Sequence, residues 1–488
     1  MAGKTATRFI ILPTRGFVAS ETTGSEALNT LFALQRPGLI ALKQAVAPAL
    51  NVRVLSSLHE NGPKLVEMTE LQAFNLRKSN PGLRVVPEVR YQIARAPHVE
   101  VAFGKKAFPS ANLTKLRLTV VLKNGVAPVP DVMVVAFTNF AKGVGAQGKT
   151  NAKGQVSLAL PATTKKLEKV YLYAEHTAWP MIVRNLLVSA GPIALPAIDL
   201  AFADSRVKAC GPFSAGDGQG VKIGVLDTGC GPHSAIHVAK GVSAVFGDSD
   251  QDFTDTHGHG THVAGVIAAH SPAFTGIAPA GTLNVYRVFP RSGAGASNFD
   301  IGNAIDQAVA DGCDLLNLSL GGGDMDAVTD EAIKAARAKG TICVIAAGNE
   351  GGPVANPGAH PLAACISAMG FNGAWPKGAT QDDDLTKPAG KFKTYIAAFS
   401  NTGPEIDLTG SGCGIISTYP KERFAVMDGT SMACPCATGA IARRLAKAPA
   451  ILGAARNASR ADQIVQLAQA DTKDLGFPPS KQGAGLRA

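Results

Sequence analysis

The alternation of hydrophobic and polar residues changes twice along the chain, near residues 110 and 210, and so divides it into three parts. In the first part, short apolar runs predict strands at residues 8–12, 52–55, 64–68 and 83–93. Helices are predicted over residues 26–47, with an interruption near Pro37, and over residues 70–76. The order β-α-β-β-α-β is typical of a small independent α+β domain, which we assign to residues 1–105.

The second of these helices has recognisable end signals. Thr69 and Gln72 have the spacing of a capping box, in which each side chain accepts a hydrogen bond from the other residue's main chain. Asn80-Pro81-Gly82 then predicts the end of the helix, because proline cannot continue one.

The second part has the period of two that half-buried strands require. Apolar positions alternate with others over residues 116–122, 156–160 and 170–174, and residues 132–137 are apolar throughout. Turns rich in Gly, Pro and Asn separate these runs, so residues 110–200 are predicted to form a β-sandwich that acts as a binding or spacer module. Residues 190–218, rich in Gly, Pro and Ala, are expected to be a linker.

The third part, residues 210–488, alternates strands with helices. Strands are predicted at residues 221–226, 283–288, 314–320 and 341–347, and helices at residues 260–269, 298–310 and 330–339. This pattern predicts an α/β domain with a mostly parallel sheet and helices on both faces. Ligands of such sheets bind at the carboxyl ends of the strands.

Composition narrows the class of protein. The 488 residues are 46% hydrophobic and 17% charged, which is typical of a globular protein. The net charge of +10 is spread without a basic block, so we expect no nucleic-acid partner. No apolar run reaches the length of a membrane span, and no secretory signal is visible, so we expect a cytoplasmic or non-classically exported protein. The eight cysteines all follow residue 205 and are expected to be reduced and mostly buried.

Four polar residues stand where chemistry is expected. Asp227 ends the first strand of the third part, Asn349 follows another strand, and His259 and Ser431 each begin a helical pattern. Taken singly, each has a structural explanation as a turn residue or helix cap, and His259 with His262 could also bind a metal. Together they supply a nucleophile, a base, a carboxylate that orients the base, and a donor for an oxyanion.

The roles follow from the chemistry of acyl transfer. A serine hydroxyl is a weak nucleophile at its ordinary pKa and needs an adjacent base. Histidine accepts and returns a proton near neutral pH, and a carboxylate on its other ring nitrogen fixes the tautomer. A carboxamide and the N–H groups at a helix start can stabilise the oxyanion.

Residues 215–488 resemble the subtilisin-like serine proteases, the subtilase family. The resemblance rests on four motifs in the family's chain order: VLDTG around Asp227, GHGTHVAG around His259, AAGNEG around Asn349 and DGTSMACP around Ser431. It implies that Asp227 orients the base His259, that Ser431 is the nucleophile and that Asn349 is the oxyanion donor. It also implies an endopeptidase that acts on proteins or peptides and requires no cofactor.

The resemblance implies binding sites for the substrate as well. The walls of the S1 pocket, which holds the residue before the scissile bond, would be Ser319, Leu320, Gly321, Gly322, Ala347 and Gly348. Residues 293–297, with Gly293 and Gly295, would pair with the substrate main chain as an added strand.

Residues 8–93 resemble, less strongly, the family's inhibitory propeptide, chiefly in the order of their elements and in the segment NPGLRVVPEV. This resemblance implies a cis-acting inhibitor and a zymogen. The chain departs from the family because about 100 residues of predicted sandwich follow. Any autocleavage is therefore expected somewhere between about residues 94 and 215.

Two further features leave alternatives open. Asp248, Asp250 and Asp252 could bind calcium or form a solvated acidic loop. Residues 372–394, which contain Gln381-Asp-Asp-Asp384, form an apparent insertion in the family pattern.

The alternatives for function are a scaffolding protein with an inactive protease domain, and an esterase or lipase. The second is disfavoured because Ser431 lies in Gly-Thr-Ser-Met-Ala and not in Gly-x-Ser-x-Gly.

Overall fold

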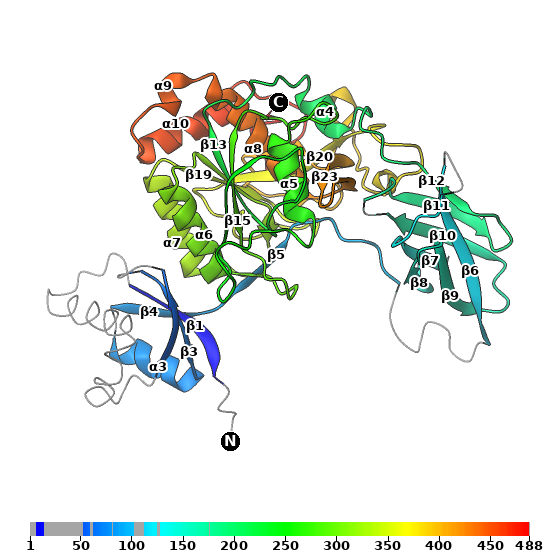
Figure 1. The fold of residues 1–488 in the computed structure, drawn as a ribbon, viewed down its shortest axis with the longest axis horizontal. Coiled ribbons are helices and arrows are strands. Elements are labelled where there is room, and N and C mark those ends of the chain that lie inside the picture. Colours follow the sequence, from blue (N-terminus) through cyan, green and yellow to red (C-terminus); the bar gives the residue numbers. More distant parts are fainter. Residues whose placement is uncertain are drawn as a thin grey trace.

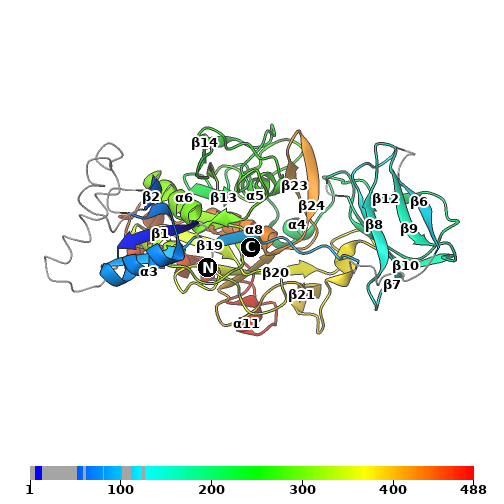
Figure 2. The same ribbon diagram turned by 90° about the horizontal axis from the view of Figure 1, so that it is seen from below.

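We describe a computed structural model of the chain, which covers residues 6–13, 52–58, 62–80, 82–101, 112–123, 127–174 and 176–487. Two domains lie on opposite sides of a larger central one, and a segment that contains β5 (Arg90–Ile93) runs along the central domain between them (Figures 1 and 2). The predicted helix at residues 26–47 lies outside the described residues. Within them, no helix has the length and apolar character that crossing a bilayer requires.

The described residues of the N-terminal domain form an antiparallel sheet with one described helix. Its elements are β1 (Thr7–Pro13), β2 (Arg53–Ser57), β3 (Lys64–Met68), α3 (Glu70–Ser79) and β4 (Leu83–Pro87). The strand order is β2-β3-β1-β4. The capping box of Thr69 and Gln72 is confirmed, since each side chain accepts a main-chain hydrogen bond from the other residue.

One prediction in this domain was wrong. The single strand expected over residues 83–93 is two strands, β4 and β5, and only β4 belongs to the N-terminal sheet. After β4 the chain passes to the central domain, where the side chain of Asn298 accepts a hydrogen bond from the main chain of Val89.

Residues 113–195 form two sheets that pack face to face around a shared apolar core. One sheet has the order β11-β10-β7-β8 and the other β12-β6-β9. The strands are β6 (Leu113–Leu122), β7 (Met133–Asn139), β8 (Val144–Lys149), β9 (Gln155–Pro161), β10 (Lys166–Tyr173), β11 (Met181–Leu187) and β12 (Ile193–Leu195). We call this part the sandwich domain.

The linker predicted over residues 190–218 contains two regular elements. Strand β12 buries Ile193 and Leu195 in the sandwich core. Helix α4 (Ser205–Cys210) is capped by the side chain of Asp204, which accepts a hydrogen bond from the main chain of Val207. Burial of two side chains and one helix cap therefore outweighs a composition that favours a loop.

The central domain is built on a sheet of order β14-β15-β13-β17-β19-β20-β21, with β22 also paired to β20. Neighbouring strands from β14 through to β20 run parallel, and so does the pair of β20 and β22. Its strands are β13 (Lys222–Asp227), β14 (Val238–Ser243), β15 (Thr282–Arg287), β17 (Leu315–Leu318), β19 (Ile342–Ala346), β20 (Ala364–Phe371), β21 (Thr394–Ile396) and β22 (Leu408–Ser411). Short strands outside it are β16 (Ala296–Ser297), β18 (Leu320–Gly321), β23 (Ile415–Tyr419) and β24 (Arg423–Met427).

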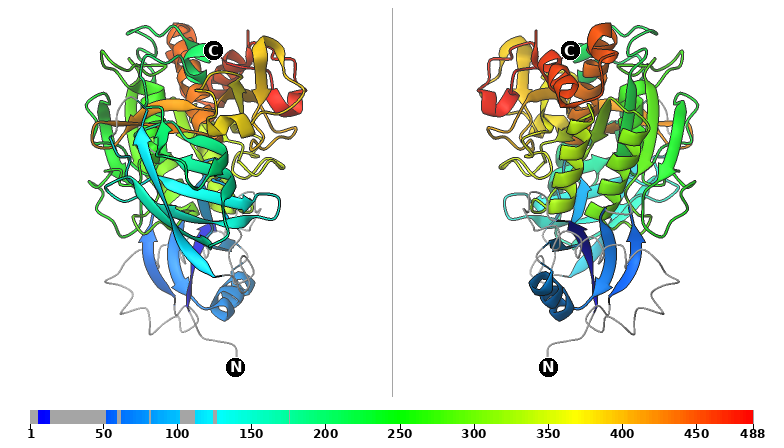
Figure 3. Two further views of the ribbon diagram at one scale, coloured as in Figure 1. Left: turned by 90° about the vertical axis from the view of Figure 1, so that its right-hand side faces the viewer. Right: turned by 90° about the vertical axis from the view of Figure 1, so that its left-hand side faces the viewer.

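Helices cover both faces of this sheet, which bears out the predicted fold class. On one face, α5 (His259–Ala268) and α8 (Thr430–Ala446) pack into a shared apolar core. On the other face, α6 (Asn298–Ala310) and α7 (Ala327–Ala338) pack side by side (Figure 3). The remaining helices are η1 (Thr380–Asp383), η2 (Lys391–Lys393), α9 (Pro449–Leu452), α10 (Ala458–Gln469) and α11 (Pro479–Gln482).

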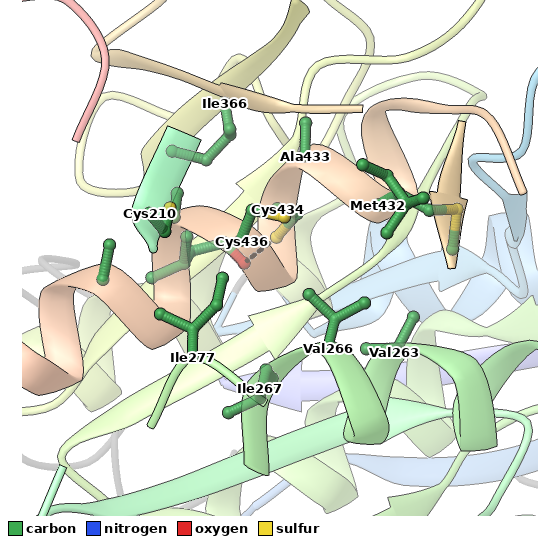
Figure 4. Packing of buried hydrophobic residues seen from close by; sticks show 14 of the residues in the cluster. Cys210, Val263, Val266, Ile267, Ile277, Ile366, Met432, Ala433, Cys434 and Cys436 are labelled. Carbon is green, nitrogen blue, oxygen red and sulfur yellow. Dashed lines mark hydrogen bonds between the residues drawn. The ribbon is translucent and has the colours of Figure 1, made fainter. Parts of the chain in front are cut away.

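The eight cysteines are buried and unpaired, as predicted. Cys434 and Cys436 of α8 pack with Cys210 of α4 and with residues of α5, among them Ile267 (Figure 4). Burial raises the pKa of both α8 thiols, so they remain protonated core residues.

Candidate active site

Asp227 and His259 lie in contact at the carboxyl end of β13. The Asp227 carboxylate accepts a hydrogen bond from Nδ1 of His259 at 2.7 Å, and both side chains are fully buried. The Nε2 atom of His259 has no hydrogen-bond partner among the described residues. With Nδ1 protonated toward Asp227, Nε2 carries the lone pair that a base requires.

A second carboxylate, which the sequence reasoning missed, holds this arrangement in place. Asp255 accepts hydrogen bonds from the hydroxyls of Thr228 and Thr261 and from the main chain of Gly258. It thereby ties the end of β13 to the start of α5. Its position in the segment between Asp227 and His259 gives it no separate sequence signal.

The other two histidines of the motif are used differently. His262 is buried and donates from Nε2 to the carbonyl of Ile415 at 3.0 Å, as the prediction of a packing role requires. Burial lowers its pKa to about 3. Burial and the neighbouring His259 also lower the pKa of His257. Neither ring has a hydrogen bond to Asp227 among the described contacts.

Ser431 lies at the start of α8, where its main-chain N–H is free of intrahelical bonding. Its hydroxyl donates to the carbonyl of Ser319 at 3.0 Å, while the hydroxyl of Ser319 donates to the Ser431 carbonyl at 2.9 Å. These two contacts join the start of α8 to Ser319, the residue after β17. Because Oγ of Ser431 is bound to the Ser319 carbonyl, a rotation about the Cα–Cβ bond is required to direct it toward a base.

Asn349 lies beside Ser431 with its amide nitrogen available. Its Oδ1 accepts from the main chain of Thr430 at 2.8 Å and from the Thr430 hydroxyl at 3.2 Å. Its buried Nδ2 has no partner among the described residues. The Thr430 contacts fix the orientation of the carboxamide, so that the donor end is left for another acceptor.

A carbonyl of the chain itself lies in this site. The main-chain N–H of Ser431 donates to the carbonyl of Ala94 at 3.0 Å. The N–H of Ala94 donates to Ser319 at 3.2 Å, and the N–H of Ala96 donates to the carbonyl of Asp428 at 3.0 Å. Main-chain hydrogen bonds thus hold Ala94 from both sides beside Ser431.

The residues before Ala94 form an added strand between two strands of the central domain. β5 is antiparallel to β16, with Tyr91 opposite Ala296, and to β18, with Ile93 opposite Leu320. Tyr91 is completely buried, and its hydroxyl donates to Asp326 at 2.6 Å. The sequence reasoning did not find this strand pairing.

The predicted substrate-binding residues lie around this strand, with one correction. Leu320 and Gly321 pair with β5, and the carbonyl of Ser319 accepts from Ala94, the next residue. The strand expected over residues 293–297 is only Ala296–Ser297, because residues 290–293 form a turn closed by the N–H of Gly293 on the carbonyl of Pro290.

The other predicted pocket residues lie nearby. The carbonyl of Gly295 accepts from the Arg90 guanidinium at 2.8 Å, and Gly293 and Gln92 line one shared cavity. Gly348 donates to the Thr430 hydroxyl, Ala347 is buried, and Gly322 donates to the carbonyl of Asn356.

The acidic loop considered for calcium is paired with arginines. Asp248 accepts from Arg287 at 2.6 Å and Asp252 from Arg291 at 2.5 Å. Among the described residues, no group of three or more His, Cys, Asp or Glu side chains has the arrangement of a metal site.

Comparison with known proteins agrees with this geometry. The profile of the subtilase family matches residues 218–485, which contain all four motifs. Subtilisin Savinase of Lederbergia lenta is 34% identical over 49% of this chain and 81% of its own. Subtilisin DY of Bacillus licheniformis is 34% identical over 48% of this chain and 80% of its own. An intracellular serine protease of Paenibacillus polymyxa is 33% identical over 55% of this chain and 79% of its own. The chain therefore belongs to the subtilase family and is a subtilisin-like serine endopeptidase.

Proposed function

We propose that Asp227, His259 and Ser431 act as the catalytic triad and that residues 90–94 inhibit the enzyme in cis until the bond between Ala94 and Arg95 is cut. The observation that carries the proposal is the contact of 3.0 Å between the Ser431 N–H and the Ala94 carbonyl. An oxyanion formed from that carbonyl would be stabilised by the same N–H and by Nδ2 of Asn349.

The reaction proceeds through an acyl-enzyme. His259 Nε2 removes the proton from Ser431 Oγ as Oγ attacks the carbonyl carbon, and Asp227 stabilises the imidazolium. His259 then gives the proton to the departing amine, and water repeats the sequence to release the acid. Protein substrates would use the same main-chain contacts that β5 makes, because these contacts depend little on side chains.

Inhibition follows from occupancy of the cleft. While β5 pairs with β16 and β18, no other peptide can form those hydrogen bonds. The N-terminal sheet also contacts the central domain, since Ile10, Leu12 and Leu65 share an apolar cluster with Phe299 and Val328. A preformed domain that presents the strand lowers the entropy cost of its binding.

The triad is tested with Ser431→Ala. We expect the variant to lose both cleavage of casein and labelling by a fluorophosphonate, while wild type is labelled. Labelling of the variant at the wild-type rate would show that Ser431 is not the nucleophile.

The inhibition is tested by measuring the rate at which the fluorophosphonate labels the protein. Wild-type protein is expected to react faster after residues 1–94 have been cut away than before. Equal labelling rates for the two forms would contradict inhibition in cis.

A further inference from the structure

The insertion at residues 372–394, which the triad does not use, joins the sandwich domain to the central domain. The main chains of Ile182 and Gly378 are hydrogen-bonded at 2.8 Å, and those of Pro180 and Thr380 at 3.1 Å. The Asp383 carboxylate accepts hydrogen bonds from the side chains of Lys169, Tyr171 and Arg184 of the sandwich domain, at distances between 2.5 and 3.0 Å. This interface fixes the position of the neighbouring Asp384.

A cavity of about 140 Å³ lies at this junction, immediately beyond Ala94. The residues that line it include Arg95 and His98 on the segment that leaves the cleft, and Asp384 and Asp428 on the central domain. Nε2 of His98 lies 3.3 Å from the Arg95 guanidinium. The cavity therefore faces the first residue after the proposed scissile bond.

The two carboxyl groups form the acidic wall of this cavity. Asp428 accepts from the main chain of Gly414 at 2.6 Å and from the Gln381 side chain at 2.7 Å. Burial raises the pKa of Asp384, with Asp428 as the next cause. Burial also raises the pKa of Asp428, whereas the positive charge of Arg95 acts to lower it. Two carboxylates in one desolvated site repel each other, and a cation bound in the same cavity relieves that repulsion.

We infer that Asp384 and Asp428 select a basic residue at the first position after the scissile bond. The inference rests on the proposed function, because it takes Ala94–Arg95 as the bond presented to Ser431. Asp384 is the better of the two to substitute, since Asp428 is part of the Ser431 motif and its carbonyl also accepts a hydrogen bond from Ala96. Arg95 is the occupant in the uncut chain, and a substrate with Arg or Lys at this position replaces it.

The test uses the processed enzyme and peptides that carry residues 88–98 of this sequence. In the panel, the residue that corresponds to Arg95 is Arg, Gln or Glu. We expect kcat/KM to fall about tenfold from Arg to Gln and at least about 50-fold from Arg to Glu, since like charges in a desolvated site are strongly disfavoured. A control peptide with Lys at the position of Arg95 keeps the positive charge and should change kcat/KM by no more than about threefold.

The enzyme variant Asp384→Asn should cleave the Arg and Gln peptides at rates within about threefold of each other. Asp382→Asn, on the same insertion but outside the cavity lining, is the matched control and should keep the tenfold preference. Wild type that cleaves all three peptides equally would overturn the inference and leave the proposed function intact. If no peptide is cleaved and the fluorophosphonate does not react, the proposed function itself fails.

A second measurement uses the uncut chain and does not depend on peptides. Arg95→Glu should slow the appearance of the fragment 95–488, and adding Asp384→Asn should recover most of that rate. Arg95→Glu that is processed at the wild-type rate would contradict the inference. Thermal unfolding of each variant in the Ser431→Ala background identifies any variant that fails to fold. If Asp384→Asn fails to fold, the Arg95 variants and the peptide panel still test whether a basic residue is selected.

Discussion

Residues 90–94 contact the central domain mainly through hydrogen bonds between main chains, whereas residues 98–101 contact the sandwich domain through side chains of that domain, namely Tyr173 and Gln147. On the first side, β5 is antiparallel to β16 and β18. On the second, the His98 ring stacks on Tyr173 with centroids 3.8 Å apart, and the N–H of Val99 donates to the Tyr173 hydroxyl at 3.0 Å. The comparison shows that one segment of the chain can be held by two kinds of recognition, of which the second depends more strongly on residue type.

The largest effect on processing is expected when the main-chain hydrogen bond of Ala94, at the end of the paired segment, is removed. Ala94→Pro removes the N–H that donates to Ser319, so formation of the fragment 95–488 should slow at least about 100-fold. Gel analysis over time measures the rate. Ala94→Ser keeps the N–H and a small side chain, and should be processed within about tenfold of wild type. If Ala94→Pro were processed normally, the main-chain account of this side would be wrong.

Loss of the oxyanion donor should slow catalysis nearly as much as Ala94→Pro slows processing. Asn349→Ala is expected to lower kcat by about 100-fold or more, a magnitude established for such a donor in a subtilisin. KM should change little, because the donor acts mainly on the oxyanion. A variant with unchanged kcat and raised KM would assign Asn349 to substrate binding.

Tyr91 is the one large buried side chain among residues 90–94. Its substitution therefore tests how far the binding of these residues depends on a side chain. Tyr91→Ala should slow processing by about 10–100-fold, because a buried aromatic ring is lost. Tyr91→Phe keeps the ring and loses only the hydroxyl that donates to Asp326. Equal effects of the two variants would show that the hydrogen bond, and not the burial of the ring, positions β5.

Recognition of Arg95 by the acidic cavity should respond to pH, while the pairing of β5 should not. Burial raises the pKa of Asp384 and Asp428, so their carboxyls become protonated at a higher pH than an exposed aspartate. As the pH falls through these raised values, the cavity loses negative charge and the preference for Arg over Gln after the scissile bond should decline toward one. His98 and Arg95 also face the cavity, whereas Asp383 is paired with Lys169 and Arg184.

Kinetics of the Arg and Gln peptides between pH 5 and pH 8 measure this decline, with Asp384→Asn as the reference that removes one of the two carboxyls. A preference that grows on acidification would contradict the assigned sign.

The smallest effect is expected at the aromatic contact. Tyr173→Phe keeps the stacking on His98 but removes the acceptor for Val99. In the Ser431→Ala background, amide exchange at Val99 should accelerate by about five- to tenfold, which corresponds to one neutral hydrogen bond. Exchange at Tyr91, on the other side of Ala94, should stay unchanged.

The same contrast explains what the sequence could predict. Asp227, His259, Asn349 and Ser431 could be predicted from the sequence because their chemistry allows few alternatives at each position. The cap at Thr69 was found because its spacing is local. The pairing of β5 with β16 and β18 was missed, since main-chain hydrogen bonds leave no pattern of residue types in the sequence.

Two other features depend on contacts between distant segments. Asp384 lies at the cleft because the insertion binds the sandwich domain through Asp383, whose partner Lys169 lies 214 residues earlier in the sequence. Strand β12 and helix α4 form in a stretch whose composition favours a loop, because Ile193, Leu195 and Asp204 find buried partners.

The central claim is that Ser431 faces the Ala94–Arg95 bond of its own chain. Intact-mass analysis and N-terminal sequencing of purified wild type and Ser431→Ala test it directly. We expect wild type to yield a fragment that begins at Arg95 and ends at residue 488, and Ser431→Ala to remain uncut. A wild-type cut at another bond, or the same cut in Ser431→Ala, would contradict the account.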